Sequence, residues 1–231
     1  VKQFKTILSG GGTGGHIFPA IAIANAIKSE NGSAEILFVG SSHRMEMTRV
    51  PKAGYPIKGL WISGIQRKIS IQNLLFPLKL IVSLWRSYFI LKRYQPQVVV
   101  GTGGFASGPL LYMATRMNIP SLIQEQNALP GITNRLLGKY VQRICIAHKE
   151  AAAFFPSTKT QLTGNPLRSE LIRLNIDTEE ARKKMGLSQK KITLLVVGGS
   201  LGAKRMNQLV ASQLIKLTDM GVQIVWQCGS L

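Results

Sequence analysis

The stretch Ser9-Gly10-Gly11-Gly12-Thr13-Gly14-Gly15-His16-Ile17-Phe18-Pro19 decides the fold class of this chain. It is a glycine-rich loop between an apolar run, Thr6 to Leu8, and a helical stretch, Ala20 to Lys28. Glycine allows a close backbone approach and positive φ values that a Cβ atom would forbid. We place Pro19 in the first turn of the following helix, a position that proline tolerates. A strand, a glycine loop and a helix start together form an anion-binding arrangement, usually for phosphate.

Two side chains inside this loop carry chemistry. Thr13 has a hydroxyl that can bond a sugar or phosphate oxygen, and His16 has an imidazole, the side-chain type most often used to take up and release protons at physiological pH. The dinucleotide pattern G-x-G-x-x-G can be drawn through Gly10, Gly12 and Gly15, but so many glycines make that match nearly automatic. From the loop alone, a catalytic His16 and a His16 that only caps or packs a tight turn stay equally open.

The charge is the most unusual bulk property of the chain. Its 231 residues include 29 Lys and Arg against 10 Asp and Glu, a formal net charge of +19, and 45% are hydrophobic. This composition predicts a globular protein with an anionic partner, either nucleic acid or an acidic membrane surface. Cys145 and Cys228 lie far apart, which predicts neither a disulfide framework nor a metal cluster and favours a reducing, cytosolic compartment. The N-terminus lacks a signal-peptide pattern, so we do not expect secretion.

Short apolar runs alternate with helical stretches along the whole chain. After the first strand, we predict strands over residues 35–39, 97–101, 120–123, 143–147, 192–197 and 222–227. We predict helices over residues 71–93, 108–116, 132–139, 178–185 and 204–217. Strands that alternate with helices indicate βαβ units and a parallel sheet, so the predicted fold class is α/β.

The segment 73–94 is the most hydrophobic part of the chain. Pro77 and two basic residues interrupt it, so it is a poor membrane-spanning helix. Aromatic and basic residues on one helix instead predict a surface that rests on an anionic bilayer. An ordinary core helix with solvated lysines is the alternative, and the net charge favours the membrane surface. The residues of the predicted membrane surface are Leu75, Leu78, Lys79, Val82, Trp85, Arg86 and Phe89.

Two more glycine loops follow predicted strands. The first runs from Gly101 to Pro109 and contains Gly103, Gly104 and Ser107, and the second runs from Gly198 to Ala203 and contains Ser200. In open parallel sheets, ligands bind in the crevice outside the carboxyl ends of the strands. Three glycine loops at such ends therefore predict a ligand site.

Polar residues mark two further places. Gln124-Glu125-Gln126-Asn127 ends a predicted strand, and four such side chains suit hydrogen bonding to a polyhydroxylated ligand. A helix cap would explain only one of them. The turn-rich stretch from Thr163 to Arg168 predicts a hinge, with Arg168 placed to meet an anion. We place the domain boundary there, with residues 1–164 in one domain and residues 165–231 at the start of a second.

Five motifs in this order resemble those of the MurG family of glycosyltransferases, which add N-acetylglucosamine to lipid I to make lipid II. They spread over nearly the whole chain, so the resemblance is specific. It implies the glycosyltransferase type B fold, with two Rossmann-like domains that face each other across a cleft. The motifs are Gly11–His16, Gly103–Pro109, Glu125–Asn127, Gly164–Arg168 and Gly198–Ala203.

The resemblance also implies partners and contacts. The acceptor, lipid I, is assigned to the first two glycine loops, including Gly103, Gly104 and Ser107, and to the basic apolar helix, with its polyprenyl chain in the membrane. No cofactor, metal or nucleic acid is expected. The implied location is the cytoplasmic face of the bacterial inner membrane, as a peripheral protein of peptidoglycan biosynthesis. The implied contacts of UDP-N-acetylglucosamine are Thr13, Gly14, Gly15, Asn127, Arg168 and Ser200.

The family inverts configuration at the transferred sugar. The acceptor's C4 hydroxyl must lose a proton as it attacks the anomeric carbon, and a base that titrates near neutrality does this best. His16 is our hypothesis for that base, and Glu125 is the competing candidate. Arg168 and the backbone N–H groups of the Ser200 loop would stabilise the negative charge on the departing UDP.

Two departures from the family pattern matter. Gln124 stands where many relatives carry histidine, which removes a proton-handling role at that position. The chain also ends at Leu231, before the family's second domain is complete, so we expect the residues that bind uracil and ribose to be missing. An inactive fragment that docks on the membrane and binds the acceptor without transfer is therefore the alternative.

Two rival classes fit the sequence less well. A nicotinamide-dependent oxidoreductase needs an acidic residue at the end of the second strand, where this chain has Val39-Gly40-Ser41-Ser42. A nucleic-acid binder should cluster basic residues with aromatic ones in a polar groove. The clearest basic cluster here lies among leucines.

Overall fold

The chain folds into two compact units. The computed structural model describes residues 3–64, 71–167, 176–199 and 202–229. The units comprise residues 1–173 and 174–231. The boundary that the sequence places between residues 164 and 165 lies slightly before this division, and it stays a prediction.

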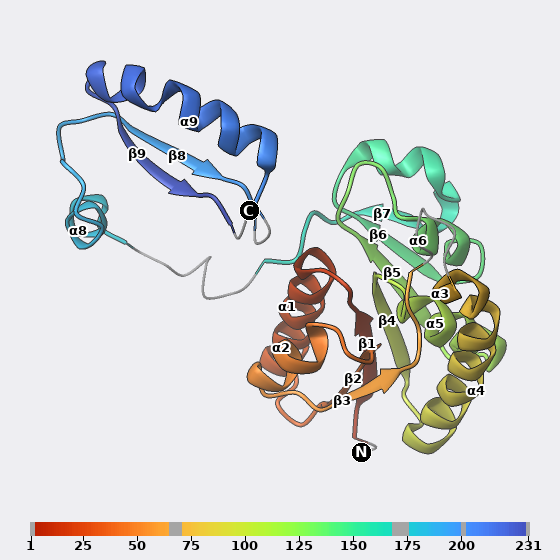
Figure 1. Ribbon diagram of the computed structural model, residues 1–231. Coiled ribbons are helices and arrows are strands. Elements are labelled where there is room, and N and C mark those ends of the chain that lie inside the picture. Colours follow the sequence, from red (N-terminus) through yellow and green to blue (C-terminus); the bar gives the residue numbers. More distant parts are fainter. Residues whose placement is uncertain (1–2, 65–70, 168–175, 200–201, 230–231) are drawn as a thin grey trace. The chain divides into compact units, whose positions relative to one another are not determined.

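The first unit is built on a seven-stranded parallel sheet (Figure 1). The strand order is β3-β2-β1-β4-β5-β6-β7, so the order reverses between β1 and β4, the usual ligand-binding point of doubly wound sheets. β1 pairs in parallel with both β2 and β4. The strands are β1 (Lys5–Gly10), β2 (Glu35–Ser41), β3 (Ile57–Leu60), β4 (Val98–Gly103), β5 (Ser121–Glu125), β6 (Arg143–Ile146) and β7 (Thr160–Leu162).

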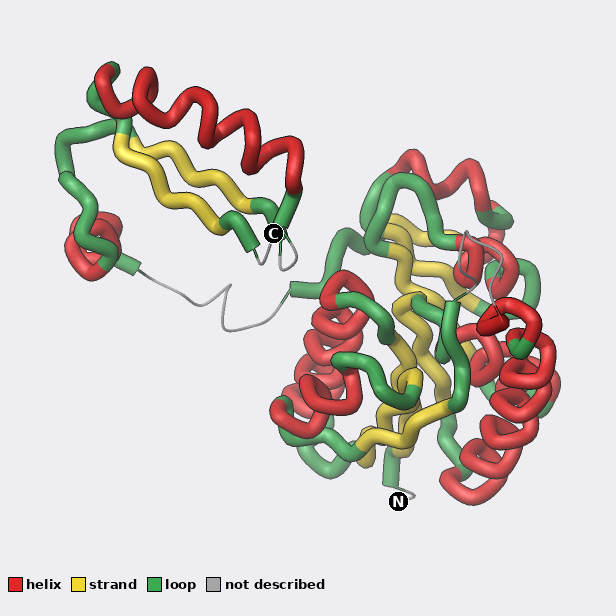
Figure 2. Tube along the Cα trace, viewed as in Figure 1, coloured by secondary structure: helices red, strands yellow, loops and turns green. Residues whose placement is uncertain are grey.

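Helices cover both faces of this sheet, as Figure 2 shows. The helices α1 and α2 pack on one face, whereas α4 and α5 pack on the other. Each parallel pair needs a crossover connection, and these helices provide it. The helices are α1 (Gly14–Glu30), α2 (Glu46–Lys52), α3 (Ile71–Leu74), α4 (Phe76–Tyr94), α5 (Ser107–Arg116) and α6 (Ile132–Leu137), with the 3₁₀ helices η1 (Lys149–Phe154) and η2 (Ser157–Lys159).

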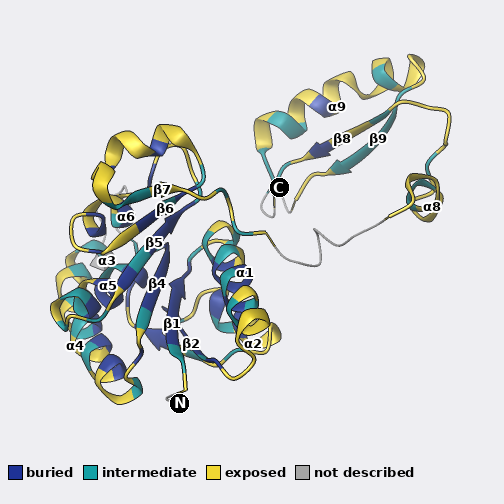
Figure 3. Cartoon of the chain, turned by 180° about the vertical axis from the view of Figure 1, so that it is seen from behind, coloured by how far each residue is buried: buried dark blue, intermediate teal, exposed yellow. Residues whose placement is uncertain are grey.

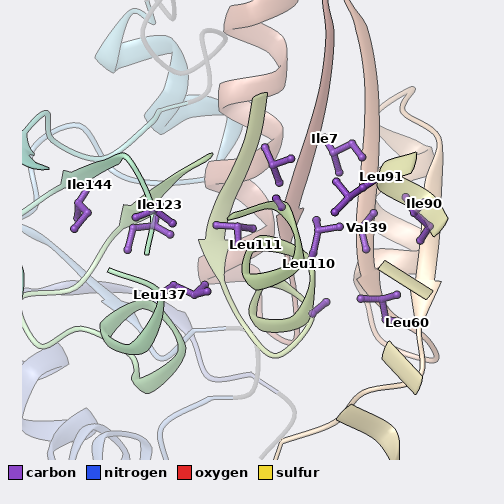
Figure 4. Packing of buried hydrophobic residues seen from close by; sticks show 14 of the residues in the cluster. Ile7, Val39, Leu60, Ile90, Leu91, Leu110, Leu111, Ile123, Leu137 and Ile144 are labelled. Atoms are coloured by element: carbon purple, nitrogen blue, oxygen red, sulfur yellow. The ribbon is translucent and has the colours of Figure 1, made fainter. Parts of the chain in front are cut away.

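The two faces hold two separate hydrophobic cores, because side chains of a strand alternate between faces. In β1, Ile7 packs into the core under α4 and α5, and the next residue, Leu8, packs into the core under α1. Figure 4 shows the first of these cores, with Ile7, Ile123 and Ile144 from three different strands. Strands buried on both faces read as continuous apolar runs, which explains why the sequence revealed them.

Two helices differ from the sequence prediction. α1 begins at Gly14, so Pro19 lies inside the helix and not in its first turn, and that expectation is wrong. The carbonyl oxygen of Thr13 starts the helix early by accepting from the N–H groups of His16 and Ile17. The predicted helix 71–93 is two helices, α3 and α4, because Pro77 falls in the first turn of α4 and cannot continue a preceding helix.

The second unit contains two parallel strands, β8 (Thr193–Val197) and β9 (Gln223–Gln227), with α8 (Thr178–Lys184) and α9 (Lys204–Asp219). Asp177 caps α8, since its carboxylate accepts from the N–H of Glu179 at 2.7 Å. Of the described hydrophobic residues in this unit, Val196 and Val210 are buried. Most of its described residues are exposed (Figure 3).

Ile123 tests the sheet core. It is fully buried in β5, so Ile123→Ala should lower the free energy of unfolding by about 2–5 kcal/mol. Urea denaturation measures this loss. The matched control is Ile81→Ala, because Ile81 on α4 is 64% exposed and its loss should change stability by less than about 0.5 kcal/mol. Equal losses in the two variants would contradict the assigned core.

Candidate active site

The two glycine loops of the first unit touch each other at the sheet's reversal point. The N–H of Gly11 donates to the carbonyl oxygen of Gly103 at 3.3 Å. A Cβ on Gly104 would lie 2.2 Å from the carbonyl oxygen of Gly11, and Gly104 has a φ of +88°. Only glycine fits there. Beside this contact lies a cavity of about 300 Å³, lined by both loops, residues 131–134 and Arg44.

The backbone N–H groups of the first loop are not all free for a ligand. Gly11 donates to Gly103, and Gly12 donates to the carboxylate of Glu46 at 3.0 Å. Among the hydrogen bonds of the described residues, none is donated by the backbone of Thr13, Gly14 or Gly15, which begin α1. The anion-binding capacity expected of the whole loop therefore belongs to its last three amides.

His16 is half-buried on the cavity wall with a fixed tautomer. Its Nδ1 lies 2.9 Å from the carbonyl oxygen of Thr102 and 3.1 Å from Oε1 of Gln126. The amide of Gln126 is oriented by its Nε2, which donates to the carbonyl oxygens of Thr102 and Gln124. Since both neighbours of Nδ1 are acceptors, Nδ1 carries the proton and Nε2 keeps its lone pair.

The carbonyl end of His16 is held as well. Thr102 Oγ1 donates to the His16 carbonyl oxygen at 2.6 Å. A Cβ on Gly103 would lie 2.7 Å from His16 Nδ1, so this glycine leaves room for the imidazole. The end of β4 therefore fixes both the backbone and the ring of His16.

Glu125 has a different environment from His16. It is 1% exposed, and four donors surround its carboxylate. Oε1 accepts from the backbone and side-chain amides of Asn127, and Oε2 accepts from the N–H of Gly131 and from Nδ2 of Asn134. These bonds join the end of β5 to the start of α6. With its lone pairs so occupied, the carboxylate organises the loop that carries Asn127.

Four other predicted site residues are not among the described residues that line the cavity. Ser107 is fully buried behind the loops, where its Oγ lies 2.8 Å from the carbonyl oxygen of Ser9, so it does not line the cavity. Asn127 is exposed. Arg168 and Ser200 lie outside the described residues.

The predicted membrane residues lie on α4, and most of them are exposed. Lys79 is the exception, because it is buried and its Nζ donates to Ser63 Oγ at 3.0 Å. It therefore does not belong to the exposed stripe, and Val82 is half-buried. The exposed members are Leu75, Leu78, Trp85, Arg86 and Phe89.

Sequence reasoning missed several residues of this site. Thr102 and Gln126 orient His16, and both belong to motifs that the sequence singled out. Glu46 and Arg44 follow the second strand after a turn, and no spacing rule connects them with the glycine loop. Glu46 is also the acid nearest to the end of β2, but it is buried under the loop and is not presented to a ribose.

No group of three or more His, Cys, Asp and Glu side chains among the described residues could hold a metal ion. No helix in the described part of the chain is both long and apolar enough to cross a bilayer.

Solved structures of similar fold define the class of protein. The crystal structure of Acinetobacter baumannii MurG has a TM-score of 0.70 at 27% identity, and the match covers 93% of this chain and 58% of that one. A putative UDP-N-acetylglucosamine 2-epimerase from Listeria monocytogenes has a TM-score of 0.66 at 11% identity, over 97% of this chain and 62% of that one. The second likeness concerns the fold alone. The class is an α/β protein with the glycosyltransferase type B fold.

Sequence relatives narrow this class to a family. The model of the glycosyltransferase family 28 N-terminal domain matches residues 6–146, and the chain belongs to this family. Relatives from Christiangramia forsetii and Flavobacterium psychrophilum are 56% and 53% identical over 230 and 231 residues. Both are named UDP-N-acetylglucosamine--N-acetylmuramyl-(pentapeptide) pyrophosphoryl-undecaprenol N-acetylglucosamine transferase. The chain spans 63% of the length of each, and the resemblance to the MurG family is confirmed.

Glu125 tests the hydrogen-bond network. In Glu125→Gln, one carboxylate oxygen becomes an NH₂ group that faces donors. The free energy of unfolding of the variant should therefore be lower by about 1–3 kcal/mol. Thermal or urea denaturation measures this. Glu150→Gln is the control, because Glu150 is exposed on η1. A Glu125 variant as stable as this control would contradict the network.

Proposed function

We propose that the protein carrying this sequence transfers N-acetylglucosamine from UDP-N-acetylglucosamine to the C4 hydroxyl of lipid I, forming lipid II with inversion at the sugar. The names of the relatives support the substrates. The observation that carries the mechanism is His16, which is held on the cavity wall with its Nε2 lone pair free.

The proposed reaction forms one bond to the anomeric carbon and breaks another, and it moves one proton. The acceptor's C4 oxygen bonds to the anomeric carbon as the bond from that carbon to the diphosphate of UDP breaks. The hydroxyl proton passes to Nε2 of His16, the general base. Glu125 is assigned a positioning role, since four donors already occupy its carboxylate.

Binding roles complete the proposal. The first two glycine loops, with Gly103 and Gly104, receive the diphosphate of the acceptor, while Ser107 holds them from behind. The negative charge that gathers on departing UDP is stabilised by amide dipoles and a guanidinium. The proposed contacts of UDP-N-acetylglucosamine are Thr13, Gly14, Gly15, Asn127, Arg168 and Ser200.

The general base is tested by kinetics. His16→Ala should lower kcat by about 10²–10⁴-fold at saturating concentrations of both substrates, because the variant lacks the imidazole that is proposed to take the proton. The measurement is release of UDP by the protein that carries this sequence. His148→Ala is the control, since His148 is exposed and distant in sequence from both glycine loops. Full turnover by the His16 variant would exclude this base.

We also propose that the protein is peripheral and rests on the cytoplasmic face of the bacterial inner membrane through α4. This helix carries apolar side chains on two sides. Ile90 and Leu91 are buried with Ser83 and Ser87 against the protein, while other large apolar side chains face outward. Exposed apolar patches of this kind mark interaction surfaces. The outward-facing residues of α4 are Leu78 (50% exposed), Ile81 (64%), Trp85 (67%) and Phe89 (47%), and Leu74 (81%) at the end of α3 precedes them.

Vesicle binding tests this surface. Arg86 is exposed among these apolar residues, and a basic side chain near an anionic surface contributes roughly 1 kcal/mol. Arg86→Glu should therefore weaken cosedimentation with anionic vesicles by at least about fivefold. Lys28→Glu makes the same charge change on α1, which covers the opposite face of the sheet, and should bind like the original protein. Equal weakening in both variants would point to net charge and away from α4.

A further inference from the structure

A buried carboxylate lies beneath the glycine loop, and the proposed reaction does not use it. Glu46 is fully buried, and its two oxygens accept from backbone groups of two different segments. Oε2 accepts from the N–H of Gly12 at 3.0 Å, and Oε1 accepts from the N–H of Ser41 at 2.9 Å. Glu46 therefore ties the loop after β1 to the turn after β2.

Two glycines leave the space that this carboxylate occupies. A Cβ on Gly11 would lie 2.1 Å from Glu46 Oε1, and a Cβ on Gly40 would lie 2.5 Å from Glu46 Cγ. The two ion pairs among the described residues do not include Glu46. Burying a carboxylate with only backbone donors is costly relative to an apolar side chain. Fold stability alone therefore does not account for this residue, and its contacts indicate a positioning role.

The turn that Glu46 closes carries Arg44 to the cavity. Ser41 at one end of the turn bonds to Glu46 at the other, and His43 between them has a φ of +64°. Arg44 is exposed, and it is the one Lys or Arg among the described residues that line the cavity. Neither ion pair of the described residues involves it.

The cavity needs such a cation. Gly11 and Gly12 both line it, yet the N–H of Gly11 donates to Gly103 and the N–H of Gly12 donates to Glu46. An anionic ligand in this cavity therefore needs donors other than Gly11 and Gly12. Beside the amide of Thr13, Arg44 offers a planar guanidinium that matches two phosphate oxygens at once.

We propose that Arg44 binds the diphosphate of the lipid-linked acceptor. Glu46 is the positioning residue, because it holds the glycine loop and the turn with Arg44 beside the same cavity. This inference rests on the proposed function, because that function supplies the diphosphate. It adds the selection of a diphosphate over a monophosphate, because the diphosphate diester carries two negative charges for Arg44 to attract and the monophosphate diester carries only one.

The test compares two soluble acceptor analogues with a short prenyl chain, one joined to N-acetylmuramyl-pentapeptide by a diphosphate and the other by a monophosphate. Titration calorimetry of the full chain at fixed low salt gives the ratio of their affinities. Arg44→Gln should weaken diphosphate binding about tenfold and bring the ratio close to one, with Arg44→Lys in between. Arg49→Gln removes the same charge from exposed α2 and should keep the original ratio.

Glu46→Gln tests the positioning residue. The glutamine amide accepts only one of the two N–H bonds, because its nitrogen is itself a donor. The variant should lower the affinity ratio and shift the Gly12 amide resonance in glycine-labelled protein. Glu30→Gln, on the exposed end of α1, should do neither. Simple destabilisation would weaken both analogues by one factor and leave the ratio unchanged.

The outcomes separate this inference from the proposed function. An unchanged ratio in Arg44→Gln would overturn the diphosphate contact, and an unchanged ratio in Glu46→Gln would overturn the positioning role. If the original protein bound neither analogue, with its Gly14 and Gly15 resonances unmoved, the proposed function itself would fail.

Discussion

The contact between the loops after β1 and β4 is the constraint on which the rest of the site depends. Gly104 approaches the carbonyl oxygen of Gly11 so closely that no side chain fits between them. This contact can form only where two parallel strands are neighbours and their connections leave in opposite directions. The cavity, the imidazole of His16 and the first turn of α1 all take their places from it.

Two buried carboxylates stabilise the loops around this contact, each through backbone N–H groups. Glu125 joins the end of β5 to α6, and Glu46 joins the first glycine loop to the turn after β2. Loops that bind a ligand are often mobile, because few contacts hold them. Here hydrogen bonds to an internal carboxylate replace contacts that a regular element would supply. Because burying a carboxylate costs free energy, we expect Glu46 and Glu125 to contribute to function as well as to structure.

The sequence pattern of α4 predicted the helical spacing of its apolar residues but did not determine which residues face the protein. The apolar spacing predicted a helix with one apolar stripe, and the structure has that stripe. Spacing cannot tell which side of a helix faces the protein. The side with Lys79, Ser83 and Ser87, which also carries the buried Ile90 and Leu91, faces β3 and α5, and a second apolar stripe faces outward. The placement of Lys79 on the outer side was wrong for this reason.

The sequence by itself determined the α/β class, most strands of the sheet and the position of the glycine loops, and it indicated His16 as a candidate base, which stays a prediction. Those features depend on local backbone freedom and on apolar runs, both of which are written in consecutive residues. The short elements α2, β3 and β7 were missed, because so few residues carry no reliable period. Only the tertiary structure decided that Gln126 and Thr102 fix the tautomer of His16, that Glu125 is enclosed by donors, and that Glu46 lies beneath Gly12. The contacts of His16 and Glu46 join segments that follow separate strands, and the distance between such segments is set by the packing of the whole sheet. The donors to Glu125 lie within nine residues of it, but only the folded turn into α6 brings them to its carboxylate.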